Sequence, residues 1–204
     1  MADYSDVEEL IKRLSPLYGQ FRPANTACPF VVDDDAAKHV ELLHCSAGRD
    51  AVYVQVLRKC DGSPPLEKLL VTIRYASFVE GTTIIYDLLD ETMQGKARPF
   101  DCDLSRGFAP EYMLLPCQIE RILIGVRDDD DSRIVDVAFL DARNEIIEAA
   151  LPFELKILDA NGTILESHFA TTNRNGKTQR KLPAMCSRIN VRSLLTGSEE
   201  SLTL

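Results

Sequence analysis

The sequence predicts a mainly β protein built on antiparallel β-sandwiches, with one short α-helix at the N-terminus. Two observations support this fold class. Apolar and polar residues alternate with a period of two in several short segments, and turn-forming residues separate these segments about every ten residues. Helical spacing of apolar residues is clear only at the start of the chain. Strands at this spacing without intervening helices favour an antiparallel sandwich over a parallel sheet.

The first expected element is a helix within residues 1–19. Ser5 followed by Glu8 forms a capping box, in which each side chain accepts a hydrogen bond from the other residue's backbone N–H. Pro16 predicts that the helix ends near Ser15, because proline has no N–H to donate. An apolar face follows the capping box and can pack on a sheet or dock with a partner; it consists of Val7, Leu10, Ile11 and Leu14.

Residues 20–116 are expected to form a β-rich unit. Apolar residues, many of them β-branched, recur at every second position in the segments 52–57, 69–75 and 84–89, which is typical of strands. Glycine and proline recur from residue 90 to residue 116. The segment 90–116 is therefore interpreted as an irregular excursion or linker.

Residues 117–204 are expected to form a second β-sandwich, immunoglobulin-like in size and strand spacing, although the chain has no Trp for the core of a true immunoglobulin domain. The segment 139–148 resembles 157–166, each with an apolar pair, a polar turn and a second apolar pair. This internal echo predicts two β-hairpins, since Asn-Gly is a strong hairpin signal. The expected strands are 119–126, 134–140, 151–158 and 189–195.

Composition restricts the partners and the location. A formal net charge of -9 argues against a nucleic-acid partner, whose phosphates are bound mainly through basic residues. The absence of Trp and an aromatic content of 7% also disfavour carbohydrate and single-stranded nucleic-acid sites. No apolar run reaches the length of a membrane span, and the N-terminus has no signal-peptide pattern. A cytoplasmic location is expected.

The cysteines are predicted to be mostly reduced, buried thiols. Six occur without a C-x-x-C pair, so a structural zinc site is not favoured and no cofactor is expected. A cysteine–histidine nucleophile pair stays open, because the partners of such a pair lie far apart in sequence. The chain contains no nucleotide-binding, serine-hydrolase or zinc-protease motif.

An acidic run provides a candidate metal site. Clustered carboxylates at a sandwich loop can bind calcium, which takes six to eight oxygen ligands. The run lacks the interspersed Gly, Asn or Ser of calcium loops, so a solvated turn is favoured over calcium binding. Its residues are Asp128, Asp129, Asp130 and Asp131.

A basic stretch provides a candidate partner site. Between Ser167 and Ser198 there are six basic residues and no acidic one, although the whole chain is acidic. Such a stripe can bind an anionic partner or an acidic face of a second copy, although charge runs commonly mark solvated strand faces. The candidate residues are Arg174, Lys177, Arg180, Lys181, Arg188 and Arg192.

The sequence therefore predicts a non-catalytic protein-interaction or structural module that binds a protein partner or self-associates. Two other classes remain open. One is a hydrolytic enzyme that depends on a cysteine or on clustered carboxylates. The other is a calcium-dependent adhesion or assembly domain.

Overall fold

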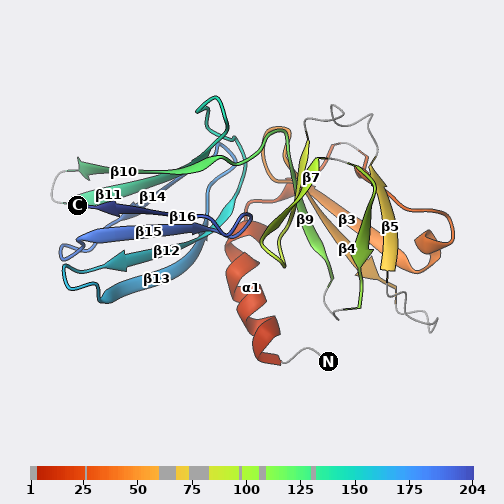
Figure 1. The fold of residues 1–204 in the computed structure, drawn as a ribbon, viewed down its shortest axis with the longest axis horizontal. Coiled ribbons are helices and arrows are strands. Elements are labelled where there is room, and N and C mark those ends of the chain that lie inside the picture. Colours follow the sequence, from red (N-terminus) through yellow and green to blue (C-terminus); the bar gives the residue numbers. More distant parts are fainter. Residues whose placement is uncertain are drawn as a thin grey trace.

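The computed structural model of the chain describes residues 4–25, 27–59, 68–73, 83–96, 98–105, 109–129 and 132–204. It confirms a mainly β fold with antiparallel sheets and a short N-terminal helix (Figure 1). The elements are α1 (Tyr4–Tyr18), β1 (Arg22–Pro23), β2 (Phe30–Val31), the 3-10 helix η1 (Ala36–Lys38), β3 (Val40–Ser46), β4 (Val52–Arg58), β5 (Lys68–Ile73), β6 (Ile84–Asp87), β7 (Thr92–Lys96), β8 (Phe100–Asp103), β9 (Glu111–Leu115), β10 (Arg121–Asp129), β11 (Ser132–Leu140), β12 (Pro152–Leu158), β13 (Ile164–Thr171), β14 (Lys177–Lys181), β15 (Arg188–Ser193) and β16 (Glu199–Thr203).

Strands β1 to β9, together with α1, make up the N-terminal half of the molecule. One sheet has the strand order β1-β3-β4-β9-β6-β7, and a smaller sheet has the order β2-β5-β8. A hydrophobic cluster confined to this half includes Phe30 of the smaller sheet and Val54 and Leu114 of the larger one. The two sheets therefore pack face to face.

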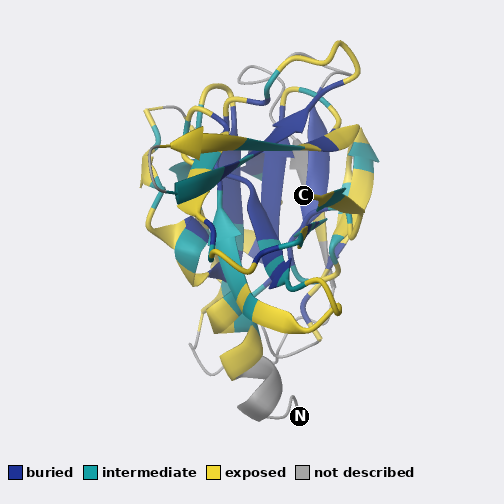
Figure 2. Cartoon of the chain, turned by 90° about the vertical axis from the view of Figure 1, so that its left-hand side faces the viewer, coloured by how far each residue is buried: buried dark blue, intermediate teal, exposed yellow. Residues whose placement is uncertain are grey.

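Strands β10 to β16 make up the C-terminal half. The sheet β10-β11-β14 packs against the sheet β13-β12-β15-β16, since residues of both belong to one hydrophobic cluster, which gives a two-layer antiparallel sandwich. Viewed from this end of the molecule, the buried segments lie in the middle and are surrounded by exposed ones (Figure 2). Among the described residues, no sheet takes strands from both halves. The boundary near residue 116 stays a prediction, because a second hydrophobic cluster extends across it.

The segment 90–116 is not an irregular excursion, so that prediction was wrong. It contains β7, β8 and β9, and β9 lies between β4 and β6 in the larger sheet with all five residues buried. A strand covered on both faces carries a continuous apolar run instead of an alternating one. The run Tyr112–Leu115 therefore shows no period of two. Strands β7 and β8 are mostly exposed edge strands that carry few apolar residues.

Helix α1 continues through Pro16 to Tyr18, beyond its predicted end. Pro16 cannot donate to the carbonyl of Lys12, but the Ser15 hydroxyl lies 3.5 Å from that oxygen and donates to it. The last turn is stabilised by the burial of Leu17, whose side chain is fully buried. Leu14 is also fully buried, whereas Ile11 of the predicted apolar face is 56% exposed. The side chain of Ser5, the first residue of the predicted capping box, lies outside the described residues.

The resemblance between the segments 139–148 and 157–166 comes from a shared type of turn, and only the second segment forms a hairpin. The second copy forms the predicted β12–β13 hairpin, but the first forms a turn closed by one isolated bridge. In both copies an aspartate side chain accepts hydrogen bonds from the backbone N–H groups two and four positions later. These residues are Asp141 and Asp159, and Asn173 acts in the same way before β14. Such side chains stabilise a turn whether or not strands continue from it.

The two halves share a hydrophobic cluster and a short stretch of paired backbone. The cluster includes Leu17 of α1, Tyr53 of the larger sheet and Phe153 of the C-terminal sandwich. Beside it, Gly48 forms an isolated β-bridge with Ala149. A Cβ atom at Gly48 would lie 2.6 Å from the Cα of Ala149, so only glycine permits this close approach.

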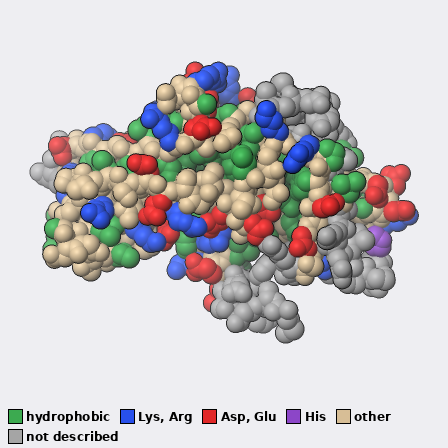
Figure 3. All heavy atoms as spheres, in the orientation of Figure 1, with side chains coloured by type: hydrophobic (Ala, Val, Ile, Leu, Met, Phe, Trp, Pro, Cys, Tyr) green, Lys and Arg blue, Asp and Glu red, His purple; other side chains and the backbone are tan. Residues whose placement is uncertain are grey.

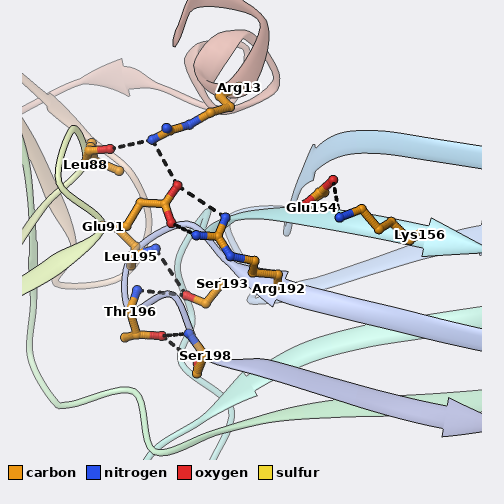
Figure 4. A network of polar contacts seen from close by, with 10 residues as sticks. All are labelled: Arg13, Leu88, Glu91, Glu154, Lys156, Arg192, Ser193, Leu195, Thr196 and Ser198. Carbon is orange, nitrogen blue, oxygen red and sulfur yellow. Dashed lines mark hydrogen bonds and ion pairs between the residues drawn. The ribbon is translucent and has the colours of Figure 1, made fainter. Parts of the chain in front are cut away.

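A carboxylate with two arginine partners links helix α1 to both halves (Figure 4). The side chain of Glu91, which follows β6, is 12% exposed. Its Oε1 lies 3.3 Å from Arg13 Nη2 of α1 and 3.4 Å from Arg192 Nη1 of β15. Arg13 also donates to the carbonyl of Leu88 at 3.0 Å. These residues form an ion-pair clasp between the helix, the larger sheet and the sandwich.

A second carboxylate anchors the end of the helix. Glu111 of β9 is 4% exposed and accepts hydrogen bonds from the Tyr18 hydroxyl at 2.9 Å and from Gln55 Nε2 at 3.1 Å. Burial raises the pKa of the Glu111 carboxyl above its ordinary value, although these hydrogen bonds oppose the shift.

We expect Glu91→Gln to lower the free energy of unfolding by about 2 kcal/mol, since it leaves two partly buried guanidinium groups close together without their carboxylate. Urea unfolding followed by circular dichroism measures the change. Glu154→Gln is the matched control: its side chain is 15% exposed and pairs with Lys156 at 3.0 Å within one sheet. Equal effects of the two substitutions would contradict a clasp between the halves.

Glu111→Gln is expected to change the pH dependence of stability. Because the pKa of Glu111 is raised in the folded protein, its contribution to stability is fully present below the ordinary value of 4.5 and is lost as the pH rises toward the folded pKa. The stability of the wild type relative to the variant should therefore decrease from pH 4 to pH 8. Exposed Glu120→Gln is the control. A wild-type-to-variant difference that is constant over this range would refute the assignment.

Candidate functional site

The six basic residues of the predicted partner site lie in separate places. Two of them hold the halves together. Arg174 donates to the Ser46 carbonyl at 2.7 Å and to the Ser46 hydroxyl at 2.9 Å, and Arg192 belongs to the clasp with Glu91. Their guanidinium groups are engaged within the chain.

Arg180 occupies the edge of the sandwich. It pairs with Val135, a core residue of β11, so its side chain points toward the opposite sheet. There its Nη2 lies 3.1 Å from Glu166 Oε2 and 2.7 Å from His168 Nε2, both on β13. Hydrogen bonds from His168 and Arg180 lower the pKa of Glu166. Inward-pointing charge of this kind protects an edge strand from pairing with another chain.

Lys177 and Lys181 point away from the core. They alternate with Arg180 along β14, are exposed, and pair with Ala138 and Ile134 of β11. Arg188 is also exposed, but it lies on β15 in the other sheet. The structure therefore brings two of the six predicted residues together on one surface.

The outer surface of the sheet β10-β11-β14 adds residues that the sequence analysis missed. Strand pairing places three rows across it. The rows are Leu123–Ala138–Lys177, Gly125–Asp136–Gln179 and Arg127–Ile134–Lys181, and Arg121 precedes them on β10. We call this surface the basic face. The alternation of Arg121, Leu123 and Arg127 with apolar residues is a period-two signal that could have identified them.

The basic face combines unpaired cations with an exposed leucine. Among the described residues, no ion pair includes the side chains of Arg121, Lys177 or Lys181. The Asp136 carboxylate is already engaged, at 2.7 Å from Gln179 Nε2 and at 3.4 Å from Arg127 Nε. Leu123 is 46% exposed beside these charges.

The basic face has no side chain at Gly125, between Leu123 and Arg127 on β10. A Cβ atom at Gly125 would contact only the Cβ of Asp136, at 3.9 Å, so no side chain rises from this position of β10. On the side of the molecule seen in Figure 3, acidic and basic side chains are interspersed over both halves. The cations of the basic face suit it to a partner surface that carries negative charge.

The acidic run does not converge in the part that the structure describes. Asp128 and Asp129 are the last residues of β10, where consecutive side chains point to opposite faces of the sheet. Asp129 also lies 3.9 Å from Arg127 Nη1. Asp130 and Asp131 lie outside the described residues. No group of three or more His, Cys, Asp or Glu residues that could hold a metal ion occurs among the described residues, and the calcium site stays a prediction.

Five of the six cysteines lie in the described part, and none of these five is in a disulfide bond. Cys102 and Cys186 are buried, whereas Cys28, Cys45 and Cys117 are partly exposed. Burial raises the pKa of Cys102 to about 11, which disfavours the reactive thiolate. No described helix is long and apolar enough to cross a membrane.

Comparisons with known proteins identify no family. No family model matches the chain, and no curated protein matches it. Among solved structures, a fragment of native alpha-2-macroglobulin from Escherichia coli spanning domains MG0-NIE-MG1 aligns with 87% of this chain and 90% of its own, at 13% identity and a TM-score of 0.31. A beta-glucuronidase from an uncultured Clostridium species aligns with 100% of this chain and 42% of its own, at 12% identity and a TM-score of 0.24.

Proposed function

We propose that the chain is a non-catalytic protein-interaction module and that the basic face binds an acidic surface of a protein partner. The observation that carries the proposal is the exposed Leu123 on the same sheet face as three cations without ion-pair partners in the described part of the chain. An apolar contact surrounded by charges is the usual plan of a protein-binding surface.

The exposed cations of the basic face orient an acidic partner and increase its rate of association. Arg121, Lys177 and Lys181 are exposed, so each contributes little to stability within the chain and is available to an acidic partner. Leu123 supplies apolar area that becomes buried on binding. Binding should therefore weaken with salt, because exposed charges are screened within about 10 Å at 0.1 M ionic strength.

The face of the sheet is a better candidate than its edge. Strand β14 pairs with β11 on one side only in the described structure, so its other edge could in principle accept an added strand. However, Arg180 points inward at that edge and is engaged with Glu166 and His168. An added strand would have to accommodate this charged cluster, whereas a partner on the outer face would not.

The structure around the face supports a preformed surface. Strand β11 pairs with β10 over nine residue pairs and with β14 over five. Both neighbouring strands are thus fixed by backbone hydrogen bonds, and little backbone ordering is required on binding.

The test uses two fluorescent peptides of about twelve residues, one alternating Glu with Leu and the other alternating Lys with Leu. We expect the acidic peptide to bind and to shift the amide resonances of β10, β11 and β14, and the basic peptide to do neither. Lys177→Glu combined with Lys181→Glu should weaken binding of the acidic peptide at least tenfold, since both cations become repulsive. Fluorescence anisotropy and ¹⁵N NMR measure the two effects.

The matched control is Arg188→Glu combined with Lys38→Glu, which changes the net charge equally at exposed positions away from the basic face. We expect it to weaken binding by less than about twofold, through the long-range field alone. If both double variants weaken binding equally, or if the acidic peptide does not bind the wild type, the basic face is not the partner site.

A further inference from the structure

A cavity of about 570 Å³ that is widely open to solvent lies where the two halves meet. Its walls come from the loop after β3, from the residues that follow β9, and from the turn after β11. Cavities of this size between structural units are common binding sites for small molecules. Its lining includes Asp50, Pro116, Cys117, Glu145, Ile146 and Glu148.

One part of the cavity wall is apolar. Pro116 and Ile146 line it beside Ile147, which is 4% exposed. The Cys117 thiol lies on the same wall and is partly exposed. A short alkyl chain would be partly desolvated against these groups.

The charged part of the wall has an excess of carboxylates. Four acidic residues and two arginines line the cavity. Arg143 is held by Asp141 at 3.2 Å and by Glu145 at 2.8 Å, which fixes its guanidinium among carboxylates. Arg49 lies 3.6 Å from Glu148. The lining therefore keeps a net negative charge after its internal pairs are formed.

Two carboxylates of the lining are available to a ligand, and Asp50 is more available than Glu148. Asp50 is exposed, and no ion pair or hydrogen bond to its carboxylate occurs within the described residues. The Glu148 side chain is 51% exposed and has one arginine contact, on one oxygen. Asp141, by contrast, is saturated, because its oxygens accept two backbone N–H groups and the Arg143 Nε–H.

We propose that this cavity binds a small organic cation that carries an ammonium group on a short alkyl stem. The stem lies on the apolar wall of Pro116 and Ile146, and the ammonium donates to the carboxylates of Asp50 and Glu148. The proposal does not rest on the basic face, which has the opposite charge preference. The ammonium belongs either to a free amine or to a lysine side chain of a partner, and the experiment separates these sources.

Cys117 serves as the reporter in the test. The protein is treated at low ionic strength with a cationic reagent, 2-aminoethyl methanethiosulfonate, or an anionic one, 2-sulfonatoethyl methanethiosulfonate. Mass spectrometry gives the rate of modification at Cys117, and each rate is divided by that of N-acetylcysteine amide with the same reagent. We expect the normalised rate to favour the cationic reagent about tenfold, since an acidic cavity concentrates cations.

Ligand protection identifies the source of the ammonium. Cadaverine should slow the modification of Cys117, whereas glutarate, a dianion of the same chain length, should not. Protection by acetyl-Ala-Lys-Ala-amide at lower concentration than by cadaverine would assign a lysine side chain as the natural ligand, and the reverse order would assign a free amine. Failure of both amines to protect would overturn the proposal.

A double variant tests the two carboxylates. Asp50→Asn with Glu148→Gln should reduce the cation preference at Cys117 to about onefold. Asparagine suits position 50, because Asp50 has a left-handed backbone with φ of +54°. Glu199→Gln with Glu200→Gln removes the same charge on β16 and should leave the preference unchanged. A preference that survives the cavity variant, or one that disappears equally in the control, would refute the site.

Discussion

The structure depends on the burial of the larger N-terminal sheet on both of its faces. Alternate residues of β4 and β9 belong to different hydrophobic clusters: Val54 and Leu114 face the small sheet, whereas Tyr53 and Met113 face helix α1 and the C-terminal sandwich. Neither layer alone covers the sheet. Part of the hydrophobic free energy that stabilises the N-terminal half therefore comes from the C-terminal half.

Polar contacts at the rim of the shared cluster fix the position of helix α1. The helix buries Leu14 and Leu17, and it also supplies Arg13 to the clasp and Tyr18 to Glu111. An apolar contact alone would permit sliding or rotation, because hydrophobic burial has no preferred direction. The ion pair of Arg13 with Glu91 and the hydrogen bond of Tyr18 to Glu111 have preferred directions, and they prevent such movement.

Most of the fold was accessible from the sequence, but the tertiary pairing was not. Period-two alternation identified β4, β11 and β12, and turn residues identified the hairpin before β13. The central strand β9 was missed, because a strand buried on both faces has no alternation to detect. The end of helix α1 was placed too early, since a local rule for Pro16 cannot anticipate the burial of Leu17.

The sequence predicted only part of the candidate site, because it does not show how the strands pair. A count of charges along the chain groups Arg174, Arg180 and Lys181, although strand geometry sends Arg180 inward and the turn before β14 sends Arg174 toward Ser46. Arg121 and Arg127 joined the basic face only through the pairing of β10 with β11. Composition locates charge in the sequence, but register decides which surface carries it.

The turn before β14 sets the register in which β14 pairs with β11. Gly176 has φ of +75°, and a Cβ atom there would collide with the carbonyl of Ile147, so the turn fits in one way against the neighbouring loop. One residue inserted after Gly176 would turn Thr178 and Arg180 outward and bury both lysines. The chemistry of the basic face is thus encoded at a position that carries no charge, and a change in loop length alone would remove the face.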